Sequence, residues 1–75
     1  MKKGKWETTI CSDVAYEHLV AEVTFDEQFL LLLDREEGRD SIHITLPKKN
    51  GELGVRILLV EFLENLRLAE ANLCR

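Results

Sequence analysis

The apolar run Phe29–Leu33 constrains the fold of this chain more than any other stretch. It contains five consecutive apolar residues and is followed by Asp34 and then by the turn-forming Glu36, Glu37 and Gly38. Because a strand presents alternate side chains to opposite faces, a strand made of this run is apolar on both faces. Both faces then need cover, which predicts a central strand in a small sheet.

Three other stretches alternate polar and apolar residues with the period of a half-buried strand. The clearest is His18–Phe25, in which every second residue from Leu19 onward is apolar. Ser41–Leu46 alternates in the same way, and Pro47 ends it because proline has no N–H to donate to a ladder. Lys5–Cys11 is interpreted as a shorter strand. Together these stretches predict an antiparallel sheet.

The connections between these strands carry turn signals of different quality. Asp26 and Glu27 are spaced like a two-residue hairpin turn, although glutamate disfavours the positive φ that such a turn requires. A three-residue loop through Gln28 is the alternative, and it would shift the register by one residue. In the polar loop Asp34–Asp40, Gly38 is expected to take the left-handed conformation.

The C-terminal third of the chain predicts a helix from about Leu59 to about Leu73. Most of its large apolar residues fall within one arc of the helix, as expected for packing against a sheet, with Val60 off to one side. The arc contains Leu59, Phe62, Leu63, Leu66, Ala69 and Leu73. Leu68 points away from this arc, either as an ordinary exposed leucine or as part of a partner surface. Leu53–Ile57 fits a short fifth strand or the first helical turn, and Gly54 with the β-branched residues around Arg56 favours the strand.

The predicted fold is therefore α+β: an antiparallel meander of four to five strands with one C-terminal helix packed on one face. Residues 1–75 are expected to form a single domain, with residues 1–4 flexible. A single helix covers only one face of the sheet. The second leucine face must be covered by curling of the sheet or by another molecule, since a large uncovered apolar patch is unusual in a monomer. We therefore expect a homodimer or a surface reserved for a protein partner.

Composition excludes several classes of function. The net charge of −4 argues against nucleic-acid binding, which depends on lysine and arginine. Cys11 and Cys74 form no Cys-x-x-Cys pair, so neither a zinc site nor a disulfide scaffold is indicated. No stretch has the length of a membrane span and the N-terminus lacks the apolar run of a signal peptide. A cytoplasmic protein that binds neither membrane nor nucleic acid is expected.

No catalytic constellation is recognisable among the reactive side chains. His18 and His43 fall on the polar faces of strands, and Cys11 has no neighbouring base in the sequence pattern. We expect no enzyme, no cofactor and no metal site, and an enzyme that depends on His43 or Cys11 is the third alternative. The carboxylates of the polar loop form either a solvated hairpin tip or a contact surface for a basic partner. With Leu68, the candidate partner contacts are Asp34, Glu36, Glu37 and Asp40.

One block of the sequence resembles the Immunity protein 10 family of bacterial polymorphic-toxin systems. The resemblance rests on the Tyr16–Val23 strand, the apolar run with its Glu-Glu-Gly turn, the Ile42–Pro47 strand and the helix that contains Phe62-Leu63-Glu64. It implies a non-catalytic inhibitor that binds and neutralises a cognate toxin, for which a neighbouring gene is the candidate source. The alternative function is a small structural or regulatory homodimer.

Overall fold

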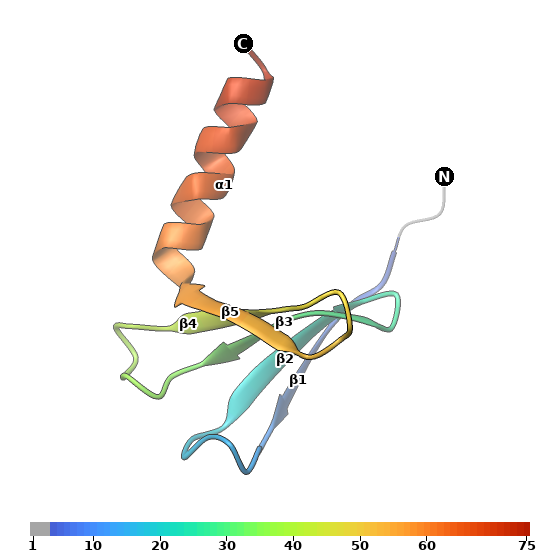
Figure 1. The fold of residues 1–75 in the computed structure, drawn as a ribbon, viewed down its shortest axis with the longest axis vertical. Helices are drawn as coiled ribbons and strands as arrows, with labels where there is room; N and C mark the ends of the chain where they lie inside the picture. Colours follow the sequence, from blue (N-terminus) through green and yellow to red (C-terminus); the bar gives the residue numbers. More distant parts are fainter. Residues whose placement is uncertain (1–3) are drawn as a thin grey trace.

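The computed structural model describes residues 4–75, which form a five-stranded sheet followed by one helix (Figure 1). The elements are β1 (Trp6–Cys11), β2 (Val20–Phe25), β3 (Gln28–Asp34), β4 (His43–Pro47), β5 (Leu53–Leu58) and α1 (Leu59–Leu73). Each strand pairs with the next one in antiparallel fashion, so the spatial order equals the chain order. The α+β meander with one C-terminal helix that contacts the sheet is confirmed. Of the segment 1–4 expected to be flexible, residues 1–3 lie outside the described part of the chain.

The apolar run forms the middle strand of the sheet, as its composition predicts. The strand registers continue across all five strands and define two faces. On the apolar face, one complete row of paired residues is Ile10, Ala21, Leu33, Ile44 and Ile57. On the polar face, the adjacent row is Thr9, Glu22, Leu32, Thr45 and Arg56. The leucine run therefore sends Leu32 to one face and Leu33 to the other.

The two faces differ in how well the chain itself covers them. On the polar face Leu32 is 2% exposed and its neighbour Thr45 is also buried. On the apolar face Ile44 is completely buried among its neighbours, but Ile10 is 62% exposed and Trp6 lies at the surface against Phe25. The chain thus covers Leu32 on the polar face, which is the second leucine face that the sequence predicted to need cover. On the apolar face, the residues at the margin stay accessible.

Helix α1 contacts β5 and projects away from the sheet (Figure 1). It begins at Leu59, directly after the last strand residue Leu58, whose backbone is still extended. None of its residues Leu59–Leu73, all of them described by the structure, is buried. Leu66 is 52% exposed and Leu73 is 85% exposed, whereas Leu59 and Phe62 are half-buried, so the C-terminal part of the predicted apolar arc faces solvent in the single chain. The contact between helix and sheet is therefore narrower than the packing across a whole face that the sequence led us to expect.

The open questions about local structure are resolved by the backbone. Asp26 and Glu27 form the two-residue turn with φ of 50° and 68°, and Phe25 pairs with Gln28, which excludes the three-residue loop. A bulge between β2 and β3 adjusts the register after Val23. Gly38 has a φ of 103°, as predicted. The ambiguous Leu53–Ile57 belongs to strand β5.

Candidate functional site

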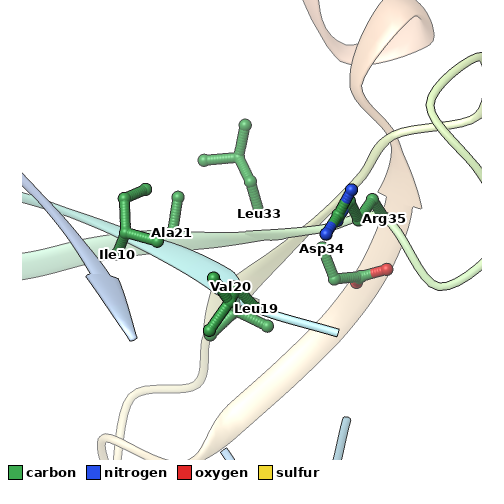
Figure 2. Close-up of a pocket in the computed structure, with 7 residues that line it drawn as sticks. All are labelled: Ile10, Leu19, Val20, Ala21, Leu33, Asp34 and Arg35. Carbon is green, nitrogen blue, oxygen red and sulfur yellow. The ribbon is translucent and has the colours of Figure 1, made fainter. Parts of the chain in front are cut away.

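An open hollow lies at the end of the sheet where β1 meets β2 and where β3 ends. It is lined by Ile10, Leu19, Val20, Ala21, Leu33, Asp34 and Arg35. Figure 2 shows Ile10, Ala21 and Leu33 pointing to the same side of the sheet, whereas Asp34 points to the opposite side. The hollow thus offers mainly apolar contacts, and the carboxylate of Asp34 is directed toward the polar face.

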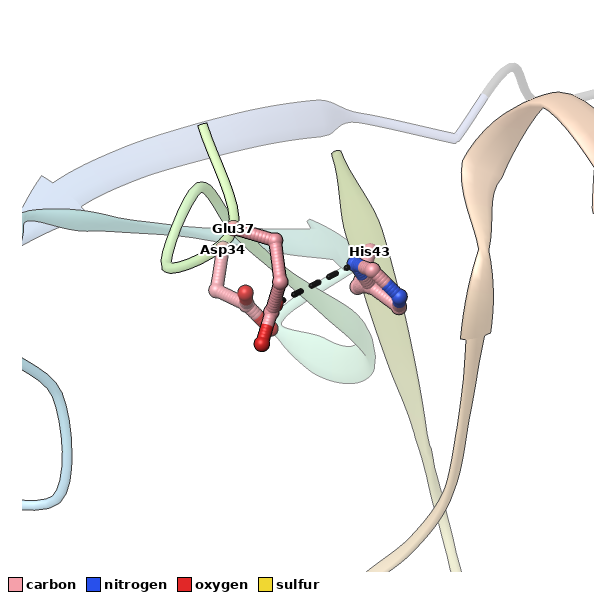
Figure 3. Close-up of side chains that lie close together, drawn as sticks. All are labelled: Asp34, Glu37 and His43. Carbon is pink, nitrogen blue, oxygen red and sulfur yellow. Dashed lines mark ion pairs between the residues drawn. The ribbon is translucent and has the colours of Figure 1, made fainter. Parts of the chain in front are cut away.

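On the polar face, three residues of the kind that bind metals gather where β3 ends and β4 begins. One ligand atom from each of Asp34, Glu37 and His43 lies within 4.8 Å of the others (Figure 3). Nδ1 of His43 is 3.5 Å from Glu37 Oε2 and 2.8 Å from the carbonyl oxygen of Ser41. Because a carbonyl oxygen only accepts hydrogen bonds, this nitrogen carries a proton and does not offer a lone pair to an ion.

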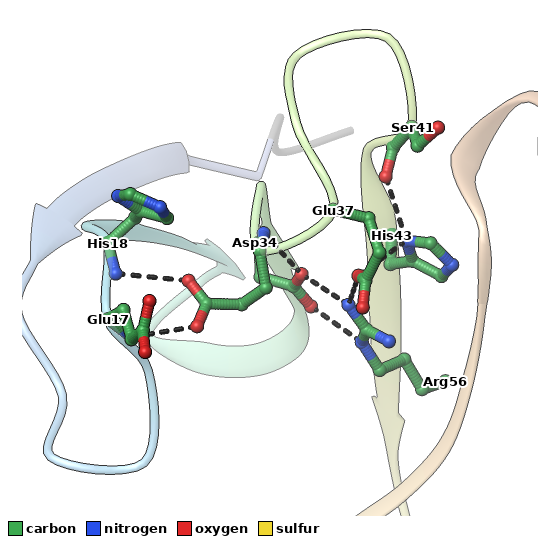
Figure 4. Close-up of polar contacts among 8 residues, drawn as sticks. Glu17, His18, Asp34, Glu37, Ser41, His43 and Arg56 are labelled. Atoms are coloured by element: carbon green, nitrogen blue, oxygen red, sulfur yellow. Dashed lines mark hydrogen bonds and ion pairs between the residues drawn. The ribbon is translucent and has the colours of Figure 1, made fainter.

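Arg56 of β5 supplies the positive charge that these carboxylates need. Its Nε and Nη2 donate to the two oxygens of Asp34 at 2.9 Å and 2.7 Å, and Nη2 also donates to Glu37 (Figure 4). Such a two-pronged bond between guanidinium and carboxylate is strong and fixes the geometry. The side chain of Asp34 is 0% exposed and that of Arg56 is 35% exposed. The cluster is therefore a partly buried ion pair between Arg56 and Asp34, to which the exposed Glu37 adds a second carboxylate.

The pKa values of the cluster follow from these contacts. The hydrogen bonds from Arg56 lower the pKa of Asp34, with a further contribution from the backbone N–H of Glu36, while burial acts in the opposite direction. The same hydrogen bonds, together with the one to Glu37, raise the pKa of Arg56. Both groups remain charged at neutral pH, which suits a structural pair and not a proton-transfer pair.

Glu36 connects the two loops at this end of the sheet. Its carboxylate accepts hydrogen bonds from the backbone N–H groups of Glu17 at 2.7 Å and of His18 at 3.0 Å. The bond from Glu17 is the main cause of the lowered pKa of Glu36. The β1–β2 loop is therefore held beside the β3–β4 loop.

The five candidate partner contacts divide into inward and outward groups. Asp34 is buried against Arg56, and Glu36 is bonded to the neighbouring loop. Glu37, Asp40 and Leu68 are exposed. Leu68 lies on α1, so the structure does not bring it together with the loop carboxylates as part of one local cluster.

The two neighbouring loops make this end of the sheet acidic. Residues 12–19 and 35–42, which we call the acidic end, contain five carboxylates and two guanidiniums, and hence carry a net charge of −3 out of the chain's −4. Glu17, Glu37 and Asp40 are exposed there. The acidic end thus carries most of the chain's net negative charge and can attract a basic surface.

The remaining reactive side chains are kept apart by the topology. His18 precedes β2 and His43 begins β4, with β3 between these strands. Partial burial, followed by the charges of Glu22 and Asp13, raises the pKa of the Cys11 thiol. A raised pKa keeps the thiol protonated and works against a nucleophilic role.

Sequence reasoning missed Arg56 as the partner of Asp34. The two residues are 22 positions apart and lie on β3 and β5, with β4 between them. The available signal was an arginine alone inside the apolar stretch Val55–Leu59, because a charge in such a stretch usually has a partner. Asp34 directly follows the apolar run and is the acidic residue that could have been expected to pair with this arginine.

Comparison with known proteins adds no further assignment. A scan against protein-family models gave no match, and searches of curated proteins and of solved structures also gave none. Within residues 4–75, no helix has both the length and the apolar character needed to cross a membrane.

Proposed function

We propose that this chain is a non-catalytic protein-binding domain of the immunity type, which binds a cognate bacterial toxin and neutralises it. The observation that carries the proposal is the acidic end, where exposed carboxylates sit on two loops that internal hydrogen bonds hold together. The resemblance of Tyr16–Leu73 to the Immunity protein 10 family supports the toxin as the partner. The proposed contacts are Glu37 and Asp40, with Glu17 beside them.

The internal bonds matter because they reduce the entropy that is lost on binding. Arg56 anchors the start of the β3–β4 loop through Asp34, and Glu36 anchors the β1–β2 loop through two backbone N–H groups. A surface that is already ordered loses less conformational freedom when a partner docks. The net charge of this end favours a basic partner surface and accelerates the encounter.

The test is co-expression of the chain with the products of the neighbouring genes in a bacterial host. We expect one neighbour to arrest growth, this chain to restore growth, and the two proteins to copurify. Asp40→Lys is expected to slow association by about tenfold at low salt, because rim charges act mainly on the association rate. Glu52→Lys, an exposed change in the β4–β5 loop at the other end of the sheet, is the matched control and should leave binding unchanged.

The proposal fails if no neighbouring product is toxic, or if a toxic neighbour is not rescued by this chain. It also fails in its choice of surface if Asp40→Lys and Glu52→Lys have equal effects on the association rate.

A further inference from the structure

We propose that two copies of this chain exchange their C-terminal helices, so that the apolar arc of α1 from one copy covers the apolar face of the sheet in the other. The inference goes beyond the proposed toxin binding and does not depend on it, because the acidic end takes no part in the contact. The occupant of the apolar face is thus a second copy of the same chain.

The accessible surface of the single chain is the first argument. It amounts to 6377 Å² for 8.7 kDa, whereas a folded monomer of that mass exposes about 4,700 Å². The excess of roughly 1,600 Å² per chain corresponds to about 3,000 Å² for two copies, within the range of permanent homodimers. Even half of this excess would equal about 1,600 Å² in total, the size of a standard specific interface.

The junction between β5 and α1 is the second argument. Leu58 ends the strand with φ −66° and ψ 132°, and Leu59 begins the helix with no residue between them. The N–H of Leu59 donates to the carbonyl oxygen of Ile42, which fixes the first turn beside β4. A helix that continues directly from a strand has no loop with which to turn back over its own sheet. Short connections of this kind favour the exchange of an element between copies.

The apolar face of the sheet and the exposed apolar arc of the helix match each other in length, which is the third argument. A 15-residue helix is about 22 Å long, and five strands spaced about 4.8 Å apart span about 19 Å. The sheet row carries no charge, and its accessible end is Ile10, since Ile44 is buried. The arc of α1 presents Leu63, Leu66 and Leu73, with the exposed Glu70 between the last two. One chain thus provides both an apolar sheet face that is accessible at the β1 margin and an amphipathic helix long enough to reach across that face.

This match favours a second copy over an unrelated protein. When each chain carries both complementary surfaces, one two-fold axis satisfies two helices and two sheets at once. An unrelated partner would need one surface to cover the apolar face of the sheet and a second surface to cover the apolar arc of α1.

The first experiment measures the mass of the intact chain in solution by light scattering after size-exclusion chromatography. We expect a dimer at micromolar concentration. Leu66→Glu places a charge in the apolar arc and should raise the dissociation constant of the dimer at least 100-fold, because a charge is strongly disfavoured in an apolar interface. Leu68→Glu is the matched control: this residue is 55% exposed, against 52% for Leu66, but lies on the opposite side of the helix. It should leave the dimer intact.

The second experiment lengthens the junction by inserting Gly-Ser-Gly-Ser between Leu58 and Leu59. The longer connection allows α1 to fold back onto its own sheet, so we expect a stable monomer with unchanged helix content. This variant also keeps the test informative if Leu66→Glu fails to fold. A monomeric native chain, equal effects of the Leu66 and Leu68 variants, or a dimer that persists after the insertion would each overturn helix exchange. The last result would indicate that the two copies associate through another surface.

Discussion

Arg56 and Asp34 form a partly buried ion pair that joins β5 to β3 across β4. We predict that Arg56→Met lowers the free energy of unfolding by about 2 kcal/mol, because it leaves the carboxylate of Asp34 without its main partner. The value lies below that of a fully buried pair because the guanidinium is partly exposed. Urea unfolding followed by circular dichroism measures the change.

The double variant Asp34→Leu with Arg56→Met tests the assignment to the pair. It should recover part of the loss, since two apolar residues leave no buried charge without a partner. Glu37→Gln is the surface control and should change stability by less than about 1 kcal/mol. Additive losses for Asp34→Leu and Arg56→Met would contradict the pairing.

The same ion pair determines how the stability of the fold changes in acid. Because Arg56 lowers the pKa of Asp34 in the folded chain, the contribution of Asp34 is fully present above the ordinary carboxyl pKa of about 3.9 and is lost as the pH falls below it. In Asp34→Asn the group no longer titrates, so the decline in stability below about pH 4 should be smaller than in the native chain.

Among the elements, the β2–β3 turn holds two non-glycine residues in the left-handed region. Asp26 also bonds with Lys5, through its carboxylate and its backbone N–H, which supports its conformation. Glu27 has no such contact among the hydrogen bonds of the described residues, and its φ is 68°. We predict that Glu27→Gly raises the free energy of unfolding by about 0.5–1 kcal/mol, since Asp-Gly suits this turn and relieves the backbone. Thermal unfolding measures the gain.

Two further glycine exchanges serve as controls for this prediction. Glu52→Gly, at a loop position without positive φ, should lower stability because glycine adds freedom to the unfolded chain. Gly38→Ala should also lower stability, since its φ of 103° strains any side chain. A gain from Glu52→Gly equal to that from Glu27→Gly would show that turn geometry is not the cause.

The strands and the helix could be predicted from the sequence because their apolar periods are local properties. Alternation located His18–Phe25 and Ser41–Leu46, and the two-faced run Phe29–Leu33 determined which strand is central. The bulge after Val23 could not be predicted, since no residue type marks it. Arg56 beside Asp34 depends on the register of three strands, which the pattern of any one strand leaves undetermined.

The position of α1 was the larger gap between sequence and structure. An amphipathic arc shows that a helix needs an apolar surface, but it does not show to which chain that surface belongs. The deciding feature is the junction at Leu58 and Leu59, where the strand passes into the helix without a loop. The first and last residues of α1 could be predicted from local signals. The surface against which α1 packs depends instead on this junction.

The whole molecule is extended for its length. Its radius of gyration is 14.0 Å, whereas a compact domain of 75 residues has about 11 Å. A chain of this size buries about 60% of its unfolded surface when it folds alone, but here the buried share is only about half. Much of the stabilising apolar burial is thus left for association, and folding and dimer formation should be coupled.

This coupling predicts a melting temperature that depends on protein concentration. If the folded unit is a dimer that unfolds to two separate chains, each tenfold increase in concentration adds about 1.4 kcal/mol to the stability of the dimer. For a unit of about 150 residues this corresponds to a rise of about 4–5 °C. Calorimetry at protein concentrations from about 5 to about 500 µM measures how the melting temperature changes with concentration. The variant with four residues inserted after Leu58 is the control, and its melting temperature should not change with concentration. A native chain with a constant melting temperature would show that the extended single chain is itself the stable unit.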